Sequence, residues 1–280
     1  MRRCLSIKRR LPPTILFKPL EAAFALSILS IFAGFSGGRK SILPGVASAA
    51  AVNENHSFKA IAHPGSHAGM LHENVISQDM VCAARSVNVA FIMNVALDGN
   101  KKVIAAFAGD LEKAHEAGCE FVKSMAQAKA VHAEIAITTN GGYPLDQNLY
   151  QCAKAAATAE ACAGNDGIII LVASCVDGIG GSYFHDLMLK GTPQEINDYL
   201  SSIPPKESIP EQWCVQIFSQ MLLKHEIILV TDKLDHQLVK KINMIPASTP
   251  DEALEIAYGI KGREAQAVVI PDGVSVIAVP

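Results

Sequence analysis

The sequence lacks the features that mark several common classes of protein. Its seven cysteines form no Cys-x-x-Cys pair, so neither a disulfide framework nor a paired-cysteine zinc site is indicated. The apolar run at residues 22–35 is shorter than the roughly 20 residues that span a bilayer. A net charge of −3 gives no case for a nucleic-acid partner, which would normally require a basic face. These absences favour buried reduced thiols and cytoplasmic residence, with no nucleic-acid or membrane partner.

The charge distribution changes near residue 20. Residues 1–18 carry six basic groups and no acidic one, whereas residues 19–280 carry 18 basic and 27 acidic groups. The basic start, the apolar run and the triplet Ala47-Ser48-Ala49 have the outline of a secretory signal peptide. The basic region is long and interrupted by Pro12-Pro13, which is atypical of such a peptide.

From residue 86 onward, apolar strand-like stretches alternate with helix-like ones. Strands are expected at 87–97, 103–108, 135–138, 167–173, 226–231, 268–270 and 274–279. Helices are expected at 110–126, 146–163, 192–202, 209–223 and 248–261. Buried strands separated by helices predict an α/β fold, with a mostly parallel sheet flanked by helices. Ligands of such sheets bind beyond the carboxyl ends of strands, so the polar loops at 138–146 and 174–182 are the expected site.

A glycine-rich stretch at residues 33–45 contains the basic pair Arg39-Lys40. Its glycines allow backbone N–H groups to approach a ligand, and its cations could hold an anion. The spacing does not match a Walker A phosphate loop. From these residues alone, an ordinary glycine-rich turn with solvated cations is the better interpretation.

Four histidines crowd together early in the chain. His63 and His67 are four residues apart, a spacing that can place two imidazoles on one face of a helix, but Pro64-Gly65 between them disfavours a helix. No His-Glu-x-x-His pattern supports a zinc hydrolase. Surface or capping positions are expected for three of the four, which are His56, His63, His67 and His72. An exported metal-binding module that uses this cluster remains an alternative hypothesis.

The stretch at 138–154 is polar, rich in glycine, and leads directly into a predicted helix. Gln151 and Lys154 lie three residues apart and so share one face of that helix. A solvated first turn is the simpler interpretation. The density of polar groups at the end of a strand favours a binding site.

Four strings resemble successive signatures of the nickel-dependent lactate racemase family. They are AGFSGGRKSILPGVAS, AFAGDLEKAHEAGCEFV, TTNGGYPLDQNLYQ and ASCVDGIGG, and they occur in the family's order. The similarity runs from about Ile31 to the C-terminus. The resemblance implies a two-domain α/β fold with the active site between the domains, of which this chain covers the hinge region and the C-terminal domain.

The resemblance also implies roles for individual residues. Lys40 matches the lysine that holds a nickel-pincer nucleotide covalently, and His56 matches the histidine that ligates its nickel, a pairing of imidazole and soft sulfur that suits Ni(II). The remaining matches face the cofactor and the substrate, and they are Tyr150, Gln151, Lys154 and Trp213.

In such a family the substrate is a 2-hydroxy acid such as lactate. The cofactor takes up and returns a hydride, while two histidines act as general bases, one for each enantiomer. Cofactor-maturation proteins are the implied partners.

Three departures from the family pattern stand out. Ser30 occupies the position of one catalytic histidine, and residues 75–77 do not read Pro-Val-His. The other catalytic histidine and a substrate-binding arginine belong to an N-terminal domain that we expect to be missing. We therefore predict a truncated or frame-shifted chain, with a non-family segment at 1–30, a cofactor-anchoring hinge at 31–85 and an α/β domain at 86–280. A catalytically inactive cofactor-binding remnant is the second hypothesis.

Overall fold

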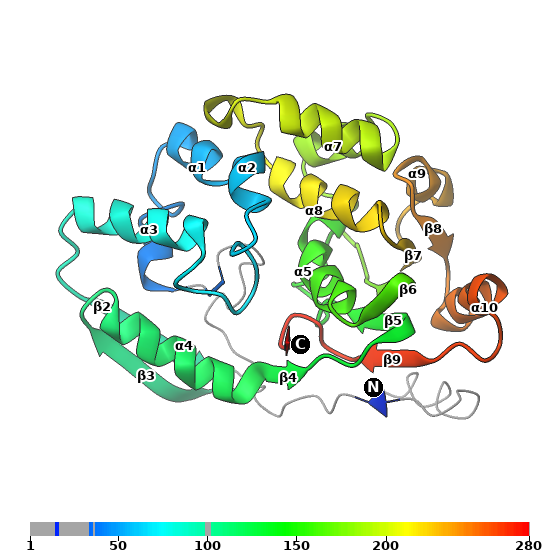
Figure 1. Ribbon diagram of the computed structural model, residues 1–280, viewed down its shortest axis with the longest axis horizontal. Coiled ribbons are helices and arrows are strands. Elements are labelled where there is room, and N and C mark those ends of the chain that lie inside the picture. Colours follow the sequence, from blue (N-terminus) through cyan, green and yellow to red (C-terminus); the bar gives the residue numbers. More distant parts are fainter. Residues whose placement is uncertain (1–14, 17–33, 36, 99–101, 280) are drawn as a thin grey trace.

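A parallel β-sheet forms the core of the larger part of the molecule, on the right in Figure 1. The computed structural model describes residues 15–16, 34–35, 37–98 and 102–279. All adjacent strands of the six-stranded sheet run parallel. Their order is β1 (Ile15–Leu16), β9 (Ala267–Ile270), β5 (Ala133–Thr139), β6 (Ala163–Val172), β7 (Glu226–Val230) and β8 (Ile245–Ala247).

Helices cover both faces of this sheet, which explains why its inner strands are almost continuously apolar. In β6, Ile169 and Leu171 face one core, and Ile168 and Ile170 face the other. The second core is closed by α10 (Pro250–Lys261). The first core is closed by α5 (Leu149–Glu160), α6 (Ser182–Met188), α7 (Pro193–Ser202), α8 (Gln212–Leu222) and α9 (His236–Lys241).

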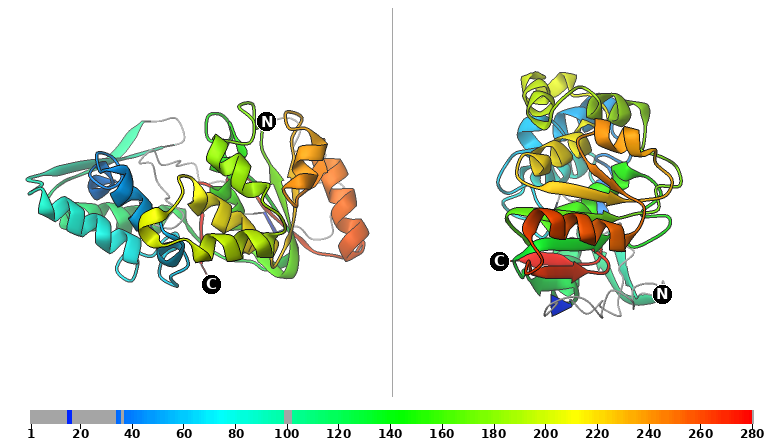
Figure 2. Two further views of the ribbon diagram at one scale, coloured as in Figure 1. Left: turned by 90° about the horizontal axis from the view of Figure 1, so that it is seen from above. Right: turned by 90° about the vertical axis from the view of Figure 1, so that its right-hand side faces the viewer.

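A smaller unit, which we call the hairpin lobe, lies beside the sheet (Figure 2). It consists of the antiparallel pair β2 (Ile92–Leu97) and β3 (Val103–Gly109) with α3 (Val75–Ser86) and α4 (Lys113–Ala126). The C-terminal strand β10 (Ile277–Val279) pairs with β4 (Gln127–Lys129), and Ile277 is buried in the core of this lobe. The chain's last strand therefore ties the two parts together.

Short helical segments bridge the hairpin lobe and the sheet. They are the 3-10 helix η2 (Gly38–Ser41), α1 (Ala49–Asn55), α2 (Phe58–Ile61) and the 3-10 helix η3 (Pro205–Glu207). Helix α1 packs on η3, and α2 packs on α7 and α8. The side chain of Gln216 in α8 donates a hydrogen bond to the carbonyl of Phe58 at 3.1 Å, and this bond fixes α2 against α8.

The predicted fold class is confirmed: the chain is α/β, with a parallel sheet flanked by helices. The start of α10 follows the expected pattern, because Thr249 accepts from the Glu252 amide at 3.1 Å and Pro250 occupies the first turn.

The stretches at 87–97, 103–108 and 274–279 do contain strands, but none of them joins the main sheet. Residues 98–102 are too few for the crossover of a dozen or more residues that a parallel pair requires, so β2 and β3 pair antiparallel. Apart from residues 15–16, the predicted non-family segment at 1–30 lies outside the described residues.

The cysteines are mostly as expected. Five of the six in the described ranges are buried and all six are free, but Cys82 is exposed, contrary to the prediction of buried thiols. Cys82 lies on α3, on a side that nothing in the described part of the chain covers. Within the same ranges, every helix falls short of the length and apolarity that a membrane crossing requires.

Shortening a buried side chain of a central strand tests whether the core is assigned correctly. Ile169 in β6 is completely buried, so Ile169→Ala should lower the free energy of unfolding by about 2–5 kcal/mol. Urea denaturation followed by circular dichroism measures the effect. Ile260→Ala is the control, since Ile260 on α10 is 46% exposed and should change stability much less. Equal losses in the two variants would contradict the assigned core.

Candidate functional site

Lys40 lies in a tight turn that is pressed against β2. Gly37 has a φ of 103°, and a Cβ at this position would come within 2.9 Å of the Asn94 side-chain oxygen. The same oxygen accepts a hydrogen bond from the Gly38 amide at 3.0 Å, and the Lys40 amide donates to the Gly37 carbonyl at 3.0 Å. The two glycines are therefore required by the close approach of the turn to the strand.

The Lys40 ammonium is largely buried and lies among other cations. Burial, then the positive charges of Lys154 and Arg39, lower the pKa of Lys40 to about 8. An amine with this pKa is neutral far more often near neutral pH than an ordinary lysine. Lys40 and Lys154 thus share one site, although they come from segments more than a hundred residues apart.

His56 ends α1 and is buried beside Trp213, with 4.8 Å between the ring centroids. Its Nδ1 lies 3.1 Å from the Val52 carbonyl oxygen. A carbonyl can only accept, so Nδ1 carries the proton and Nε2 carries the lone pair. Burial and the charge of Lys40 lower the pKa of His56 to about 4, and the imidazole is neutral at physiological pH.

The first turns of α5 and α8 supply the opposite side of the site. The Trp213 indole N–H donates to the Tyr150 hydroxyl at 2.8 Å, and Lys154 Nζ donates to Gln151 Oε1 at 2.6 Å. Burial lowers the pKa of Lys154 and raises that of Tyr150, so the phenol stays protonated. Through the Trp213–His56 contact and the Lys154–Lys40 proximity, all six predicted site residues in the described ranges come together.

The loop at 138–146 holds the start of α5. The side-chain N–H of Asn140 donates to the carbonyls of Leu145 and Gln151, and its oxygen accepts from the Ala155 amide at 3.2 Å. Asp146 accepts from the Ser174 amide at 2.9 Å, which joins this loop to the next one. The polar side chains of Asn140 and Asp146, in the loop where the sequence predicts a site, therefore serve to position α5.

The loop at 173–181 packs directly on Tyr150. Gly180 has a φ of 136°, and a Cβ there would lie 2.8 Å from the Cβ of Tyr150. The Tyr150 amide donates to the Ile179 carbonyl at 3.0 Å. Both predicted loops thus support the helix that carries three site residues.

The comparisons with known proteins agree with this arrangement. A family model described as the lactate racemase C-terminal domain matches residues 128–278, more than half of the chain. The chain belongs to the lactate racemase family. A second model, the lactate racemase N-terminal domain, matches residues 28–69.

Two curated relatives are named lactate racemase. The protein from Lactiplantibacillus plantarum is 48% identical over 88% of this chain, and the one from Thermoanaerobacterium thermosaccharolyticum is 46% identical over the same share. The apoprotein structure of the lactate racemase from T. thermosaccharolyticum matches 90% of the chain with a TM-score of 0.88 and 45% identity. The chain spans 58% of the length of each curated relative and 61% of that structure's chain.

The prediction that the N-terminal domain is missing is wrong for residues 28–69. Lys40 and His56 lie inside this match, so sequence of the N-terminal domain contributes directly to the site. The match also begins ahead of Ile31 and includes Ser30, whose own placement lies outside the described residues.

The other three histidines are exposed, as the simpler interpretation predicted. His63 Nδ1 accepts from the Gly65 amide at 3.1 Å, and so caps a turn. Among the described residues, no group of three or more His, Cys, Asp or Glu side chains could hold a metal ion. The hypothesis of a metal-binding module built on the histidine cluster therefore has no structural support.

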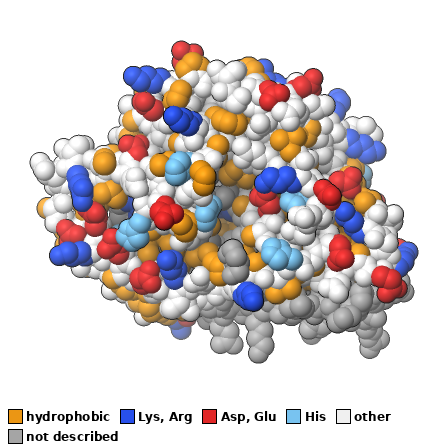
Figure 3. Space-filling view, viewed as in Figure 1, with side chains coloured by type: hydrophobic (Ala, Val, Ile, Leu, Met, Phe, Trp, Pro, Cys, Tyr) orange, Lys and Arg blue, Asp and Glu red, His pale blue; other side chains and the backbone are white. Residues whose placement is uncertain are grey.

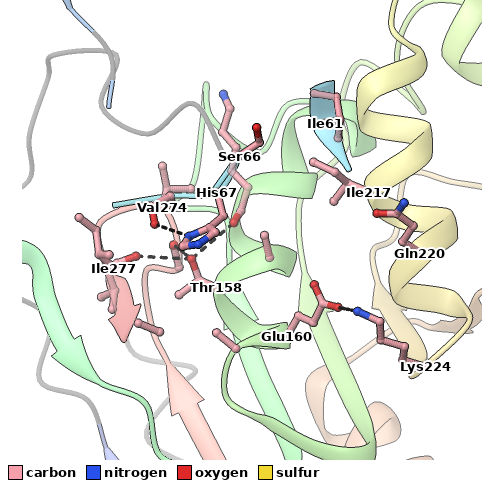
Figure 4. Close-up of a pocket in the computed structure, with 17 residues that line it drawn as sticks. Ile61, Ser66, His67, Thr158, Glu160, Ile217, Gln220, Lys224, Val274 and Ile277 are labelled. Carbon is pink, nitrogen blue, oxygen red and sulfur yellow. Dashed lines mark hydrogen bonds and ion pairs between the residues drawn. The ribbon is translucent and has the colours of Figure 1, made fainter. Parts of the chain in front are cut away.

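A groove of about 430 Å³ continues from the site along α5 and α8 (Figure 4). Lys154 is among its lining residues, and the Glu160–Lys224 ion pair, with 3.0 Å between the ammonium and the carboxylate, lies at its lower end in this view. In the space-filling view, the face between the hairpin lobe and the sheet is hollowed, with histidine side chains around the depression (Figure 3). Lys154 therefore borders both the site and the groove.

Sequence reasoning missed two residues that organise the site. Arg39 is only 1% exposed, whereas the sequence indicates one of a pair of solvated cations. Glu211 has a φ of 67° and accepts from the Phe184 amide at 2.9 Å, which joins the starts of α6 and α8. The position of Arg39 directly before Lys40 in the sequence was the one signal that could have indicated a role for Arg39.

The depressed pKa of His56 predicts a pH dependence of stability. The folded state keeps His56 neutral down to about pH 4, whereas the unfolded chain takes up a proton near pH 6.5. Stability should therefore be full above pH 6.5 and fall as the pH drops towards 4. His56→Gln should reduce this fall, measured as the melting temperature at pH 7 and at pH 4.5.

Buried His115, with its pKa lowered to about 3, should cause a similar loss of stability, so the His56→Gln variant keeps part of the dependence. The matched control is His72→Gln on the surface. An identical acid-induced loss in wild type and His56→Gln would contradict a neutral buried His56.

Proposed function

We propose that this chain provides the cofactor-binding part of a nickel-pincer-dependent racemase or epimerase of 2-hydroxy acids, with lactate as the model substrate. One observation carries the proposal. Lys40, His56 and the α5–α8 residues Tyr150, Lys154 and Trp213 converge on one site although the sequence separates them widely.

The donor set fits a nickel-pincer nucleotide. His56 is neutral, with the lone pair on Nε2, which is the form that ligates a metal. Within the described ranges no group of three or more His, Cys, Asp or Glu side chains could hold a metal, which is compatible with a cofactor that brings its own sulfur and carbon ligands. Lys40, with a lowered pKa, is suited to a covalent link through its amine.

When bound, the cofactor would supply a hydride acceptor for the carbinol carbon of the substrate. The protein's own residues would bind and orient. Lys40 and Lys154 give the cavity positive charge, which favours an anionic cofactor and a substrate carboxylate. Gln151 holds Lys154 in place at 2.6 Å, and the bonded pair Trp213–Tyr150 forms a rigid wall beside His56.

The chemistry of the site implies partners and a compartment. A covalently attached nickel cofactor requires maturation proteins to make and deliver it, and these are the proposed protein partners. Five buried free thiols favour the reducing cytoplasm. The acidic balance of the chain after residue 18 disfavours a nucleic-acid partner.

Ser30 favours a second candidate function, a cofactor-binding protein that does not turn over. Racemisation needs a base on each face of the substrate carbon, and an unactivated serine hydroxyl is a very weak base near neutral pH. A placed general base contributes roughly 10²–10⁴-fold in rate. The two candidates share the cofactor and differ in activity alone.

Cofactor loading tests the shared part. We expect the chain, produced together with the cofactor-synthesis proteins, to carry nickel and a covalent adduct on Lys40, detected by metal analysis and intact-mass spectrometry. Lys40→Arg should lose the adduct because the guanidinium does not replace the amine, and His56→Gln should keep the adduct but lose most of the nickel. Lys224→Arg, in the adjacent groove, is the control. Full loading of Lys40→Arg would refute the proposed attachment.

Activity separates the two candidates. We expect the loaded 280-residue chain to show no measurable interconversion of D- and L-lactate by chiral chromatography, while the L. plantarum relative assayed in parallel racemises both. Ser30→His should raise turnover, because an imidazole is then present where the hydroxyl is a very weak base. Clear racemisation by the unaltered chain would instead support the racemase with bases drawn from elsewhere.

A further inference from the structure

Arg39 and Lys40 are neighbours in η2, yet their side chains serve opposite sides of the turn. Lys40 lies with His56 and Lys154 in the cofactor site. Arg39 packs against the hairpin lobe, is only 1% exposed, and is among the largest fully buried side chains of the described residues. Burial of a guanidinium is unfavourable unless its N–H groups are well bonded, so the contacts of Arg39 indicate what it holds.

The guanidinium joins three separate segments. One terminal nitrogen donates to the Phe35 carbonyl at 3.1 Å and to the Ser77 hydroxyl in α3 at 2.9 Å. The other contacts Nε2 of His115 in α4. His115 is buried and its pKa is lowered to about 3, so the ring is neutral and can accept. The Sγ atom of Cys119, one turn further along α4, lies 3.3 Å from Nε2 of His115.

The backbone transmits this anchoring to Lys40. The Ile42 and Leu43 amides donate to the Arg39 carbonyl at 3.1 and 3.2 Å, and the Gly45 amide donates to the Lys40 carbonyl at 3.0 Å. On the other side of Lys40, the Gly38 amide is bonded to Asn94. A shift of the Arg39 backbone would therefore move the turn that carries Lys40, and the bonds of the Arg39 side chain oppose such a shift.

We propose that Arg39 is a positioning residue that fixes the Lys40 turn to the hairpin lobe and so aims the Lys40 amine at the cofactor site. This inference rests on the proposed function in one respect, which is the identity of the group that Lys40 binds. Its geometric part, the clamping of residues 40–46 by Arg39, is independent of any cofactor. Because the planar fork meets three partners at once, lysine cannot reproduce its bonds.

The test compares Arg39→Lys, which keeps the charge, with Arg39→Met, which removes it. Hydrogen exchange of the cofactor-free chain should become roughly fivefold or more faster in residues 40–46 of both variants, because hydrogen bonds of the clamp are lost. Peptides of β7 and α10 should not change. Arg85→Met is the matched control, since Arg85 lies on α3 with a side chain 64% exposed and pairs with Glu112 at the surface.

Covalent loading is the second measurement. A small misplacement of a reacting group can lower a rate by about 100-fold, so adduct formation on Lys40 should slow by roughly 10- to 100-fold in both Arg39 variants and remain normal in Arg85→Met. Substitutions of His115, the hydrogen-bond acceptor of Arg39, distinguish a positioning role of Arg39 from a general contribution to stability. His115→Leu should reproduce the defect, and His115→Gln, which restores an acceptor, should largely relieve it.

The outcomes separate cleanly. Unchanged exchange in residues 40–46 of both Arg39 variants would overturn the proposal, as would a uniform rise across α3 and α4 with no additional change at 40–46. If wild type itself carries no adduct, the proposed cofactor function fails, and the exchange experiment still decides the role of Arg39. A defect confined to Arg39→Met would also overturn it, since charge alone would then suffice.

Discussion

Asn140 is completely buried between the end of β5 and the first turns of α5, and both ends of its side-chain amide are bonded there. It holds the Gln151 carbonyl and the Ala155 amide, so it sets where α5 starts and how the helix is rotated. Only with α5 in this rotation about its axis do the side chains of Tyr150 and Lys154 face the site. A buried amide with satisfied bonds is a stringent constraint, because any shift leaves polar groups unpaired in the core.

The electrostatics of the site follow from burial. Burial lowers the pKa values of Lys40, Lys154 and His56; in addition, the charge of Lys154 opposes protonation of Lys40, and the charge of Lys40 opposes protonation of His56. An anionic ligand would relieve this repulsion, and a neutral imidazole is ready to ligate a metal without first losing a proton. These charges and the neutral imidazole would suit a negatively charged, metal-bearing group, which is the chemical character of the cofactor that we propose.

The site is built from two parts of the chain that are matched by different family models. Residues 28–69 contribute Lys40 and His56, and residues 128–278 contribute α5 and α8. The C-terminal strand β10 returns to the hairpin lobe, which keeps the two contributions in register. The resemblance to lactate racemases thus extends from short motifs to the way in which the motifs are brought together.

The amino-acid sequence alone determined the fold class, because continuous apolar strands such as β6 and the caps of α10 are local patterns with few structural solutions. It could not place β2 and β3 outside the main sheet, since strand partners are chosen by packing over the whole chain. The contact of His56 with Trp213, and the burial of Arg39 and Lys40, which the sequence alone indicated to be solvated, were likewise decided by tertiary structure. Contacts between distant segments, and the low dielectric that shifts their pKa values, exist only once the core has closed.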